Sequence, residues 1–172
     1  LRTLIRDRGG AVTDQRETLF GIRSVRWDPD RGLLLNGRPV RIRGACCHQD
    51  HAAVGTALPD RLQEHRVRLL KEMGCNAYRT AHHPPAPELL DACDRLGMLV
   101  MDETRLPGSA PEVLGQMERL VLRDRNHPSV VLWSIGNEEL IQDTPVGERI
   151  ARCMKRAVKR LDPTRAVTAA MN

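Results

Sequence analysis

The order of hydrophobic and polar positions changes character at about residue 44. Beyond that point, short apolar runs alternate with longer stretches in which apolar residues recur at helical spacing. The apolar runs, which predict strands, are residues 41–47, 76–81, 99–103, 129–136 and 166–171. The stretches between them, which predict helices, are residues 60–73, 88–96, 111–125 and 146–161. Continuous apolar strands that alternate with helices are typical of parallel βαβ units. The pattern therefore predicts an α/β fold of about five parallel strands and four helices.

The ends of the first two predicted helices carry recognisable signals. Asp60 is a suitable N-cap for the first helix, and Gly74 is placed to stop it. Gly97 follows the second predicted helix in the same way.

The first 43 residues have β character instead. The dipeptide Gly9-Gly10 and the segment WDPDRG are turn signals, and Asn36-Gly37 lies between two apolar runs. An Asn-Gly pair in that setting is the strongest short-range signal for a β-hairpin. A short β segment is therefore expected to precede the α/β part.

Two parallel architectures fit the alternating pattern: a doubly wound sheet, or part of an eight-stranded barrel. The sequence contains neither G-x-G-x-x-G nor G-x-x-x-x-G-K-[ST]. A nucleotide-binding doubly wound sheet therefore loses its main support.

Composition and charge narrow the function classes. The chain has 172 residues, which fits one domain, and its net charge of +5 raises the question of a nucleic-acid partner. Basic and acidic residues are interleaved and no nucleic-acid-binding motif accompanies them, so we expect no such partner. No apolar stretch reaches membrane-spanning length, so we expect no membrane partner.

The five cysteines are not arranged in any C-x-x-C motif. This argues against a disulfide framework and against a zinc site. Free cysteines favour a reducing, cytoplasmic compartment.

Polar residues collect where the predicted strands end. They are His48 after the first strand, Arg79, His82 and His83 around the end of the second, Asp102 and Glu103 at the third, and Asn137 and Glu138 at the fourth. Each could be an ordinary loop or turn residue. The carboxyl ends of parallel strands, however, form the face on which barrel active sites are built, and all of these residues fall there.

The neighbouring pair Asn137 and Glu138 suits glycoside hydrolysis. An amide can hydrogen-bond a sugar hydroxyl while a carboxylic acid protonates the glycosidic oxygen. We expect Glu138 to be partly buried at the strand tip, and Glu139 to face solvent.

A metal site is the rival interpretation. His48, His51, His82 and His83 could supply imidazole ligands, with Asp102 or Glu103 completing the set. Because H-E-x-x-H and any other tight ligand spacing are missing from the sequence, we expect neither a metal nor a cofactor.

Three segments together resemble a known family. They are NGRPVRIRGACCHQDH, LLKEMGCNAYRTAHHPPAPELLDACDRLGMLVMDE and RDRNHPSVVLWSIGNEE. They are similar to family 2 glycoside hydrolases, which include β-galactosidases and β-glucuronidases. The form RTAHHPPAPELLD is more similar to the β-galactosidase type. The resemblance covers nearly the whole chain.

The resemblance implies a (β/α)8 TIM barrel preceded by an immunoglobulin-like sandwich. Residues 1–26 would be the tail of the sandwich and residues 27–172 the amino-terminal half of the barrel. Glu138 would be the general acid/base, and Asn137 would contact the sugar 2-hydroxyl. His48 and His82 would bind the sugar ring, and Arg79 would support the nucleophile. Glu103 is the only nearby candidate within the chain for a second carboxylate, but the resemblance does not give it that role, and it is grouped with the substrate-binding residues.

Two departures from the family pattern qualify these expectations. The loop DETRLPGSAPE lacks the acid-x-His pair that holds a metal in many members, so no magnesium site is expected. The family's nucleophile, a glutamate on the seventh strand, lies beyond Asn172. We therefore expect little turnover of a carbohydrate substrate by these residues alone, and a non-catalytic sugar-binding or assembly subunit is the alternative. Five barrel strands leave two edges unpaired, so self-association is expected.

Overall fold

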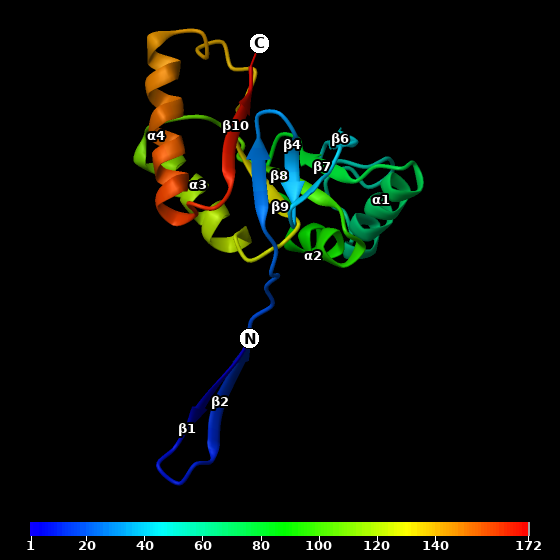
Figure 1. Ribbon diagram of the computed structural model, residues 1–172, viewed down its shortest axis with the longest axis vertical. Coiled ribbons are helices and arrows are strands. Elements are labelled where there is room, and N and C mark those ends of the chain that lie inside the picture. Colours follow the sequence, from blue (N-terminus) through cyan, green and yellow to red (C-terminus); the bar gives the residue numbers. More distant parts are fainter. Residues whose placement is uncertain (172) are drawn as a thin grey trace.

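The computed structural model describes residues 1–171 and divides their strands among three sheets. The first sheet is a hairpin of β1 (Arg2–Arg6) and β2 (Val12–Glu17) that extends away from the rest of the molecule (Figure 1). Nearly all of its residues are exposed, as are Leu19 and Phe20 in the segment that follows. A hairpin with so little packing is only marginally stable in water. The assignment of residues 1–26 to a sandwich domain stays a prediction.

The second sheet confirms the predicted Asn-Gly hairpin. It consists of β3 (Val25–Asp28), β4 (Gly32–Leu35) and β5 (Arg38–Pro39), all antiparallel. Asn36 and Gly37 connect β4 to β5 with φ of 51° and 75°, as a two-residue hairpin turn requires. Just before β3, the Arg23 guanidinium donates to the carbonyls of Pro128 and Val130, both at 2.8 Å. These bonds tie the segment to the amino end of a strand in the main sheet.

The main sheet is parallel and its strands follow one another in chain order. They are β6 (Gly44–Cys47), β7 (Ala77–Thr80), β8 (Leu99–Glu103), β9 (Val130–Asn137) and β10 (Ala166–Ala170). Every neighbouring pair is parallel. A doubly wound sheet reverses its strand order at a switch point, whereas a barrel adds each new strand on the same side. The predicted partial (β/α)8 barrel is therefore confirmed.

One helix connects each successive pair of these strands. The helices are α1 (Asp60–Glu72), α2 (Pro87–Leu96), α3 (Pro111–Asp124) and α4 (Pro145–Leu161). The N-cap prediction for Asp60 is wrong by one position: Pro59 already has the extended cap conformation, so Asp60 begins the helix. Gly74 and Gly97 have φ of 86° and 68°, which confirms them as helix stops. Within residues 1–171, no helix is long and apolar enough to span a membrane.

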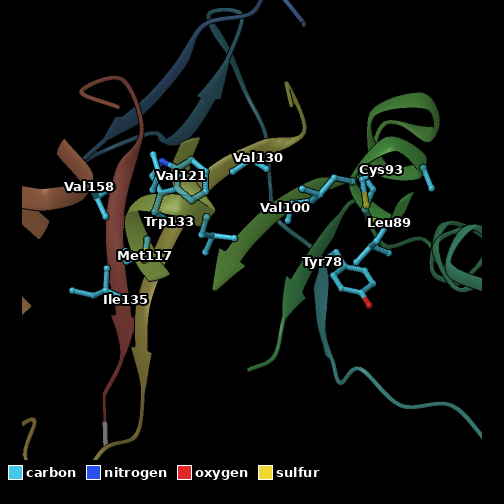
Figure 2. Packing of buried hydrophobic residues seen from close by; sticks show 14 of the residues in the cluster. Tyr78, Leu89, Cys93, Val100, Met117, Val121, Val130, Trp133, Ile135 and Val158 are labelled. Carbon is cyan, nitrogen blue, oxygen red and sulfur yellow. The ribbon is translucent and has the colours of Figure 1, made fainter. Parts of the chain in front are cut away.

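The four helices pack on one face of the sheet. Their buried side chains form a single apolar cluster with those of the strands (Figure 2). Trp133 on β9 and Val100 on β8 point into it, beside Leu89 of α2, Val121 of α3 and Val158 of α4. Right-handed crossovers that all proceed in one direction place every helix on the same side, so the other face is left for the barrel interior.

The opposite face of the sheet is only half-buried in this chain. Leu99, Met101 and Leu132 lie on it, next to Trp27 and Ile42 from the amino-terminal segment. These side chains line an open pocket of about 460 Å³ that also reaches Cys46 and Arg79. The amino-terminal segment thus covers part of the face that would become the inside of a closed barrel.

A buried polar cluster fastens the connection from α4 to β10. The Asp162 carboxylate accepts hydrogen bonds from Trp133 Nε1 at 2.9 Å and from Arg165 Nη1 at 2.6 Å. Arg165 also donates to the carbonyl of Val130 at 2.7 Å. Burial acts to raise the pKa of Asp162, but the hydrogen bonds from Thr164, Arg165 and Trp133 outweigh it and hold that pKa well below its ordinary value.

Asp102 is buried on the helix-facing side of β8, away from the barrel interior. Its two carboxyl oxygens have no hydrogen-bond partner among the described residues. Burial, and then the charge of Asp124, raise the pKa of Asp102. Arg123 donates to both carboxyl oxygens of Asp124, at 2.6 and 2.7 Å.

Replacing Asp102 by Asn is expected to make the free energy of unfolding less dependent on pH above about pH 4. Because the pKa of Asp102 is raised on folding, the folded chain keeps a proton that the unfolded chain releases above about pH 4. The free energy of unfolding therefore falls as the pH rises toward the folded-state pKa. Urea unfolding at several pH values should show this fall in the parent chain and a smaller fall in Asp102→Asn. Equal pH slopes in the two proteins would contradict the assignment.

Candidate active site

The carboxyl ends of β7, β8 and β9 bring four of the predicted residues into one hydrogen-bonded network. Arg79 on β7 donates to Glu103 at the end of β8, through Nε to Oε2 at 2.8 Å and through Nη2 to Oε1 at 3.2 Å. Its Nη2 also donates to Asn137 Oδ1 on β9 at 2.6 Å. His82, just after β7, has its Nδ1 2.7 Å from Glu103 Oε1.

Two hydroxyl residues complete the surroundings of Glu103. Ser134 Oγ on β9 donates to Glu103 Oε2 at 2.6 Å, and the Glu103 amide donates to Thr80 Oγ1 at 2.9 Å. The signal that could have found Ser134 is the strand register, because Ser134 pairs with Glu103 across the two parallel strands. Residues paired in this way point to the same face of a sheet.

Arg79 is held in its charged form. Burial acts to lower the pKa of Arg79, but the hydrogen bond and charge of Glu103 outweigh it and raise that pKa. Its Nη1 also donates to Cys46 Sγ at 3.7 Å. A single guanidinium thus links the ends of β6, β7, β8 and β9.

His48 joins the network through a ring contact. The His48 and His82 rings meet edge to face, with centroids 5.1 Å apart and planes at 87°. The His48 carbonyl accepts a hydrogen bond from Arg66 on α1, which fixes the backbone at this point. The structure therefore brings His48, predicted from the end of the first strand, next to His82, predicted from the end of the second.

Glu138 follows Asn137 directly and lies at the rim. Its amide donates to the Ala170 carbonyl at 3.0 Å, and its φ is 48°, in the left-handed region. Such a backbone costs about 1 kcal/mol or more for a non-glycine residue and is frequent at functional sites. The expectation that Glu138 is partly buried is wrong in residues 1–171. β9 ends at Asn137, and Glu138 is exposed. Glu139, expected to face solvent, is half-buried.

The family model for "Glycosyl hydrolases family 2, TIM barrel domain" matches residues 29–112 and 104–172. The chain belongs to glycosyl hydrolase family 2. A β-galactosidase of Bacteroides ovatus is 38% identical over 92% of this chain and 24% of its own length. A β-glucuronidase of Bacteroides fragilis is 34% identical over 95% of this chain and 25% of its own. The chain thus spans about a quarter of the length of these relatives.

Solved structures of family 2 proteins superpose closely on this chain. A member from Bacteroides cellulosilyticus has a TM-score of 0.90 and 40% identity, covering 99% of this chain and 24% of the other. A β-glucuronidase from Ruminococcus gnavus, solved with D-glucuronic acid, has a TM-score of 0.87 and 32% identity, covering 98% of this chain and 30% of the other. The fold found here is therefore that of part of a family 2 chain.

Among residues 1–171, the residues of the rival metal interpretation do not bring three ligand atoms close enough to share one ion. His83 hydrogen-bonds the Ala81 carbonyl through Nδ1 at 3.2 Å, and burial lowers its pKa. His51 contacts the Ala52 carbonyl in the loop after β6. The hydrogen-bonded network at the carboxyl ends of β7, β8 and β9 is called the candidate half-site below. Asp102 points to the helix side of the sheet, so only Glu103 of that pair belongs to it.

Within residues 1–171, three other side chains lie close enough to share a metal ion. They are Asp91, Asp94 and His127, at the amino end of β9. Asp94 is already engaged there, because it pairs with His127 Nδ1 at 2.7 Å and accepts from the Ser129 amide at 2.9 Å. This ion pair raises the pKa of His127 and positions the start of β9 at the end of the sheet opposite to the half-site.

Proposed function

We propose that this chain supplies the acid/base half of the active site of a retaining β-glycosidase. The observation that carries the proposal is the network of Arg79, Glu103, His82 and Asn137, which adjoins Glu138 at the carboxyl ends of the strands. This is the end of a barrel at which catalytic groups are placed. Glu138 would protonate the glycosidic oxygen and later, as a base, activate water.

The contacts of Asn137 determine which atom of its amide could hydrogen-bond a sugar. Its Oδ1 accepts from Arg79, so the amide is oriented with oxygen toward the guanidinium. The Nδ2 group is then directed elsewhere and can donate to a sugar hydroxyl. This agrees with the role that the family resemblance gives to Asn137 at the 2-hydroxyl.

Glu103 is unsuited to be the second carboxylate of a retaining mechanism. A nucleophile must reach the anomeric carbon, but Glu103 is 0% exposed and both of its oxygens accept hydrogen bonds from protein groups. We therefore propose that the nucleophile comes from a part of the barrel outside these residues, as the family pattern implies. Retaining enzymes need two such groups about 5–5.5 Å apart.

We propose a terminal β-galactoside as the substrate, with a β-glucuronide as the second candidate. The form RTAHHPPAPELLD and the β-galactosidase of B. ovatus favour the first. The β-glucuronidases of B. fragilis and R. gnavus favour the second.

The test uses this chain alone and a completed barrel, meaning this chain joined to the later strands of a family 2 barrel. Nitrophenyl β-galactoside and nitrophenyl β-glucuronide are assayed with both. We expect background turnover by the chain alone and hydrolysis of the galactoside by the completed barrel. Efficient turnover by the chain alone, unchanged in Glu138→Gln, would contradict the assignment. Calorimetry with galactose distinguishes the enzyme from the alternative, a non-catalytic sugar-binding subunit. Binding of galactose by the completed barrel without turnover would support that alternative.

We also propose that the chain self-associates. β6 and β10 each pair with only one neighbour in the described sheet, and the interior face exposes apolar surface. Unpaired strand edges with apolar surface favour association. Light scattering at micromolar concentration should give a mass above that of one chain. A monodisperse monomer would rule the association out.

A further inference from the structure

Glu103 is enclosed entirely by hydrogen-bond donors. Oε2 accepts from Arg79 Nε at 2.8 Å and from Ser134 Oγ at 2.6 Å. Oε1 lies 3.2 Å from Arg79 Nη2 and 2.7 Å from His82 Nδ1. An ionised carboxylate offers about four acceptor positions, so these contacts fill it. With no exposed surface, Glu103 can influence a sugar only through the residues that it holds.

The contacts of His82 determine which ring nitrogen carries the proton. A carboxylate paired with an arginine can only accept, so His82 Nδ1 must donate to Glu103. The other group near Nδ1 is Arg79 Nη2, at 3.3 Å, which is itself a donor. In the neutral ring the second nitrogen, Nε2, is then an acceptor.

The Nδ1 edge of His82 is turned to a buried group, so we infer that the exposed part of the ring is the part that carries Nε2. The His82 side chain is 27% exposed, whereas its Nδ1 edge faces the fully buried Glu103. Among the described residues, Nε2 has no hydrogen-bond partner, and the ring meets the exposed His48 edge to face. An acceptor in this position selects a ligand with a donor, such as a sugar hydroxyl.

We propose that Glu103 is a positioning residue that locks His82 in the Nδ1–H tautomer and so presents Nε2 as an acceptor for a substrate hydroxyl. Through Arg79, the same carboxylate sets the orientation of the Asn137 amide. Glu103 thereby fixes one acceptor, His82 Nε2, and one donor, Asn137 Nδ2, on the sugar-binding face. The substrate part of this inference rests on the proposed function, whereas the tautomer does not.

The test is ¹⁵N NMR of the chain labelled at histidine nitrogens, recorded at about pH 8, above the ordinary titration range of histidine. Long-range proton–nitrogen correlations distinguish a protonated from an unprotonated ring nitrogen. We expect His82 to show a protonated Nδ1 and an unprotonated Nε2. In Glu103→Met, which removes both acceptor oxygens, His82 should shift to the tautomer mixture shown by the exposed His65.

Two controls separate positioning from a general loss of structure. Ser134→Ala removes one contact of Glu103 but leaves the pair with His82, so the His82 tautomer should stay unchanged. His83 donates through Nδ1 to the Ala81 carbonyl, so its signals should be unchanged in every folded variant.

Either of two results would overturn the inference: a protonated Nε2 on His82 in the parent chain, or an unchanged His82 in folded Glu103→Met. If Glu103→Met does not fold, the parent spectrum alone still decides. The tautomer is measured without substrate, so an inactive completed barrel would leave this result unchanged. Failure of the tautomer inference can therefore be distinguished from failure of the proposed function.

Discussion

Glu138→Ala is expected to lower kcat/KM of the completed barrel by about 10²–10⁴-fold on a β-galactoside with a poor leaving group. Such a substrate needs its glycosidic oxygen protonated as the bond breaks, and we assign that proton to Glu138. Steady-state hydrolysis of methyl β-galactoside or lactose measures the loss.

The neighbouring carboxylate provides a matched control for this substitution. Glu139 is next in the chain, is half-buried, and has no assigned role in the reaction. Glu139→Ala should retain close to the parent rate. Equal losses in the two variants would mean that charge or folding in this turn, and not proton transfer by Glu138, determines activity.

Asp162→Ala is expected to lower the free energy of unfolding by about 3–5 kcal/mol. Asp162 is 4% exposed. Its removal leaves the indole N–H of Trp133 unpaired and the guanidinium of Arg165 without its counter-charge. The carbonyl contacts of Arg165 would remain, but they do not neutralise a buried charge. Guanidinium unfolding followed by circular dichroism measures the change.

An exposed ion pair on α4 supplies the comparison for Asp162. Glu148 pairs with Arg152 one helical turn away, with both side chains more than half exposed. Exposed pairs contribute about 0–1 kcal/mol, so Glu148→Ala should be nearly neutral. A loss in Asp162→Ala as small as that in Glu148→Ala would show that the buried cluster does not stabilise the fold.

The pH dependence of stability offers a further check on Asp162. Its pKa is lowered on folding, so its contribution is present above the ordinary carboxyl pKa and is lost as the pH falls. The difference in unfolding free energy between the parent and Asp162→Ala should therefore shrink in acid.

The sequence predicted the elements of the fold well because their signals are local. Alternating strands and helices, the Asn36-Gly37 turn and the stop at Gly97 each depend on a few neighbouring residues. The predicted N-cap differs by one position because Pro59, and not Asp60, adopts the cap conformation. Proline has no side-chain acceptor, so the sequence carries no capping signal at that position.

The arrangement within the half-site was less predictable because it depends on the direction of side chains. Asp102 and Glu103 are neighbours on β8, and successive residues of a strand point to opposite faces. The sequence alone does not say which of the two faces the interior. The structure places Glu103 in the half-site and Asp102 against Asp124.

Contacts between distant segments were also missed. Ser134 lies 31 residues from Glu103, and Trp133 lies 29 from Asp162. Each pair meets only because parallel strands and their crossover helix set the register. Such partners become visible once the strand pairing is known.

The central claim, that Glu138 is the acid/base of a retaining mechanism, is tested most directly by azide rescue of Glu138→Ala in the completed barrel. The substrate is 2,4-dinitrophenyl β-galactoside, whose leaving group departs without protonation, so a glycosyl-enzyme should form and persist for lack of a base. Azide attacks without a base, so it should accelerate turnover and yield the β-configured galactosyl azide. No acceleration by azide, or a product of α configuration, would contradict the account.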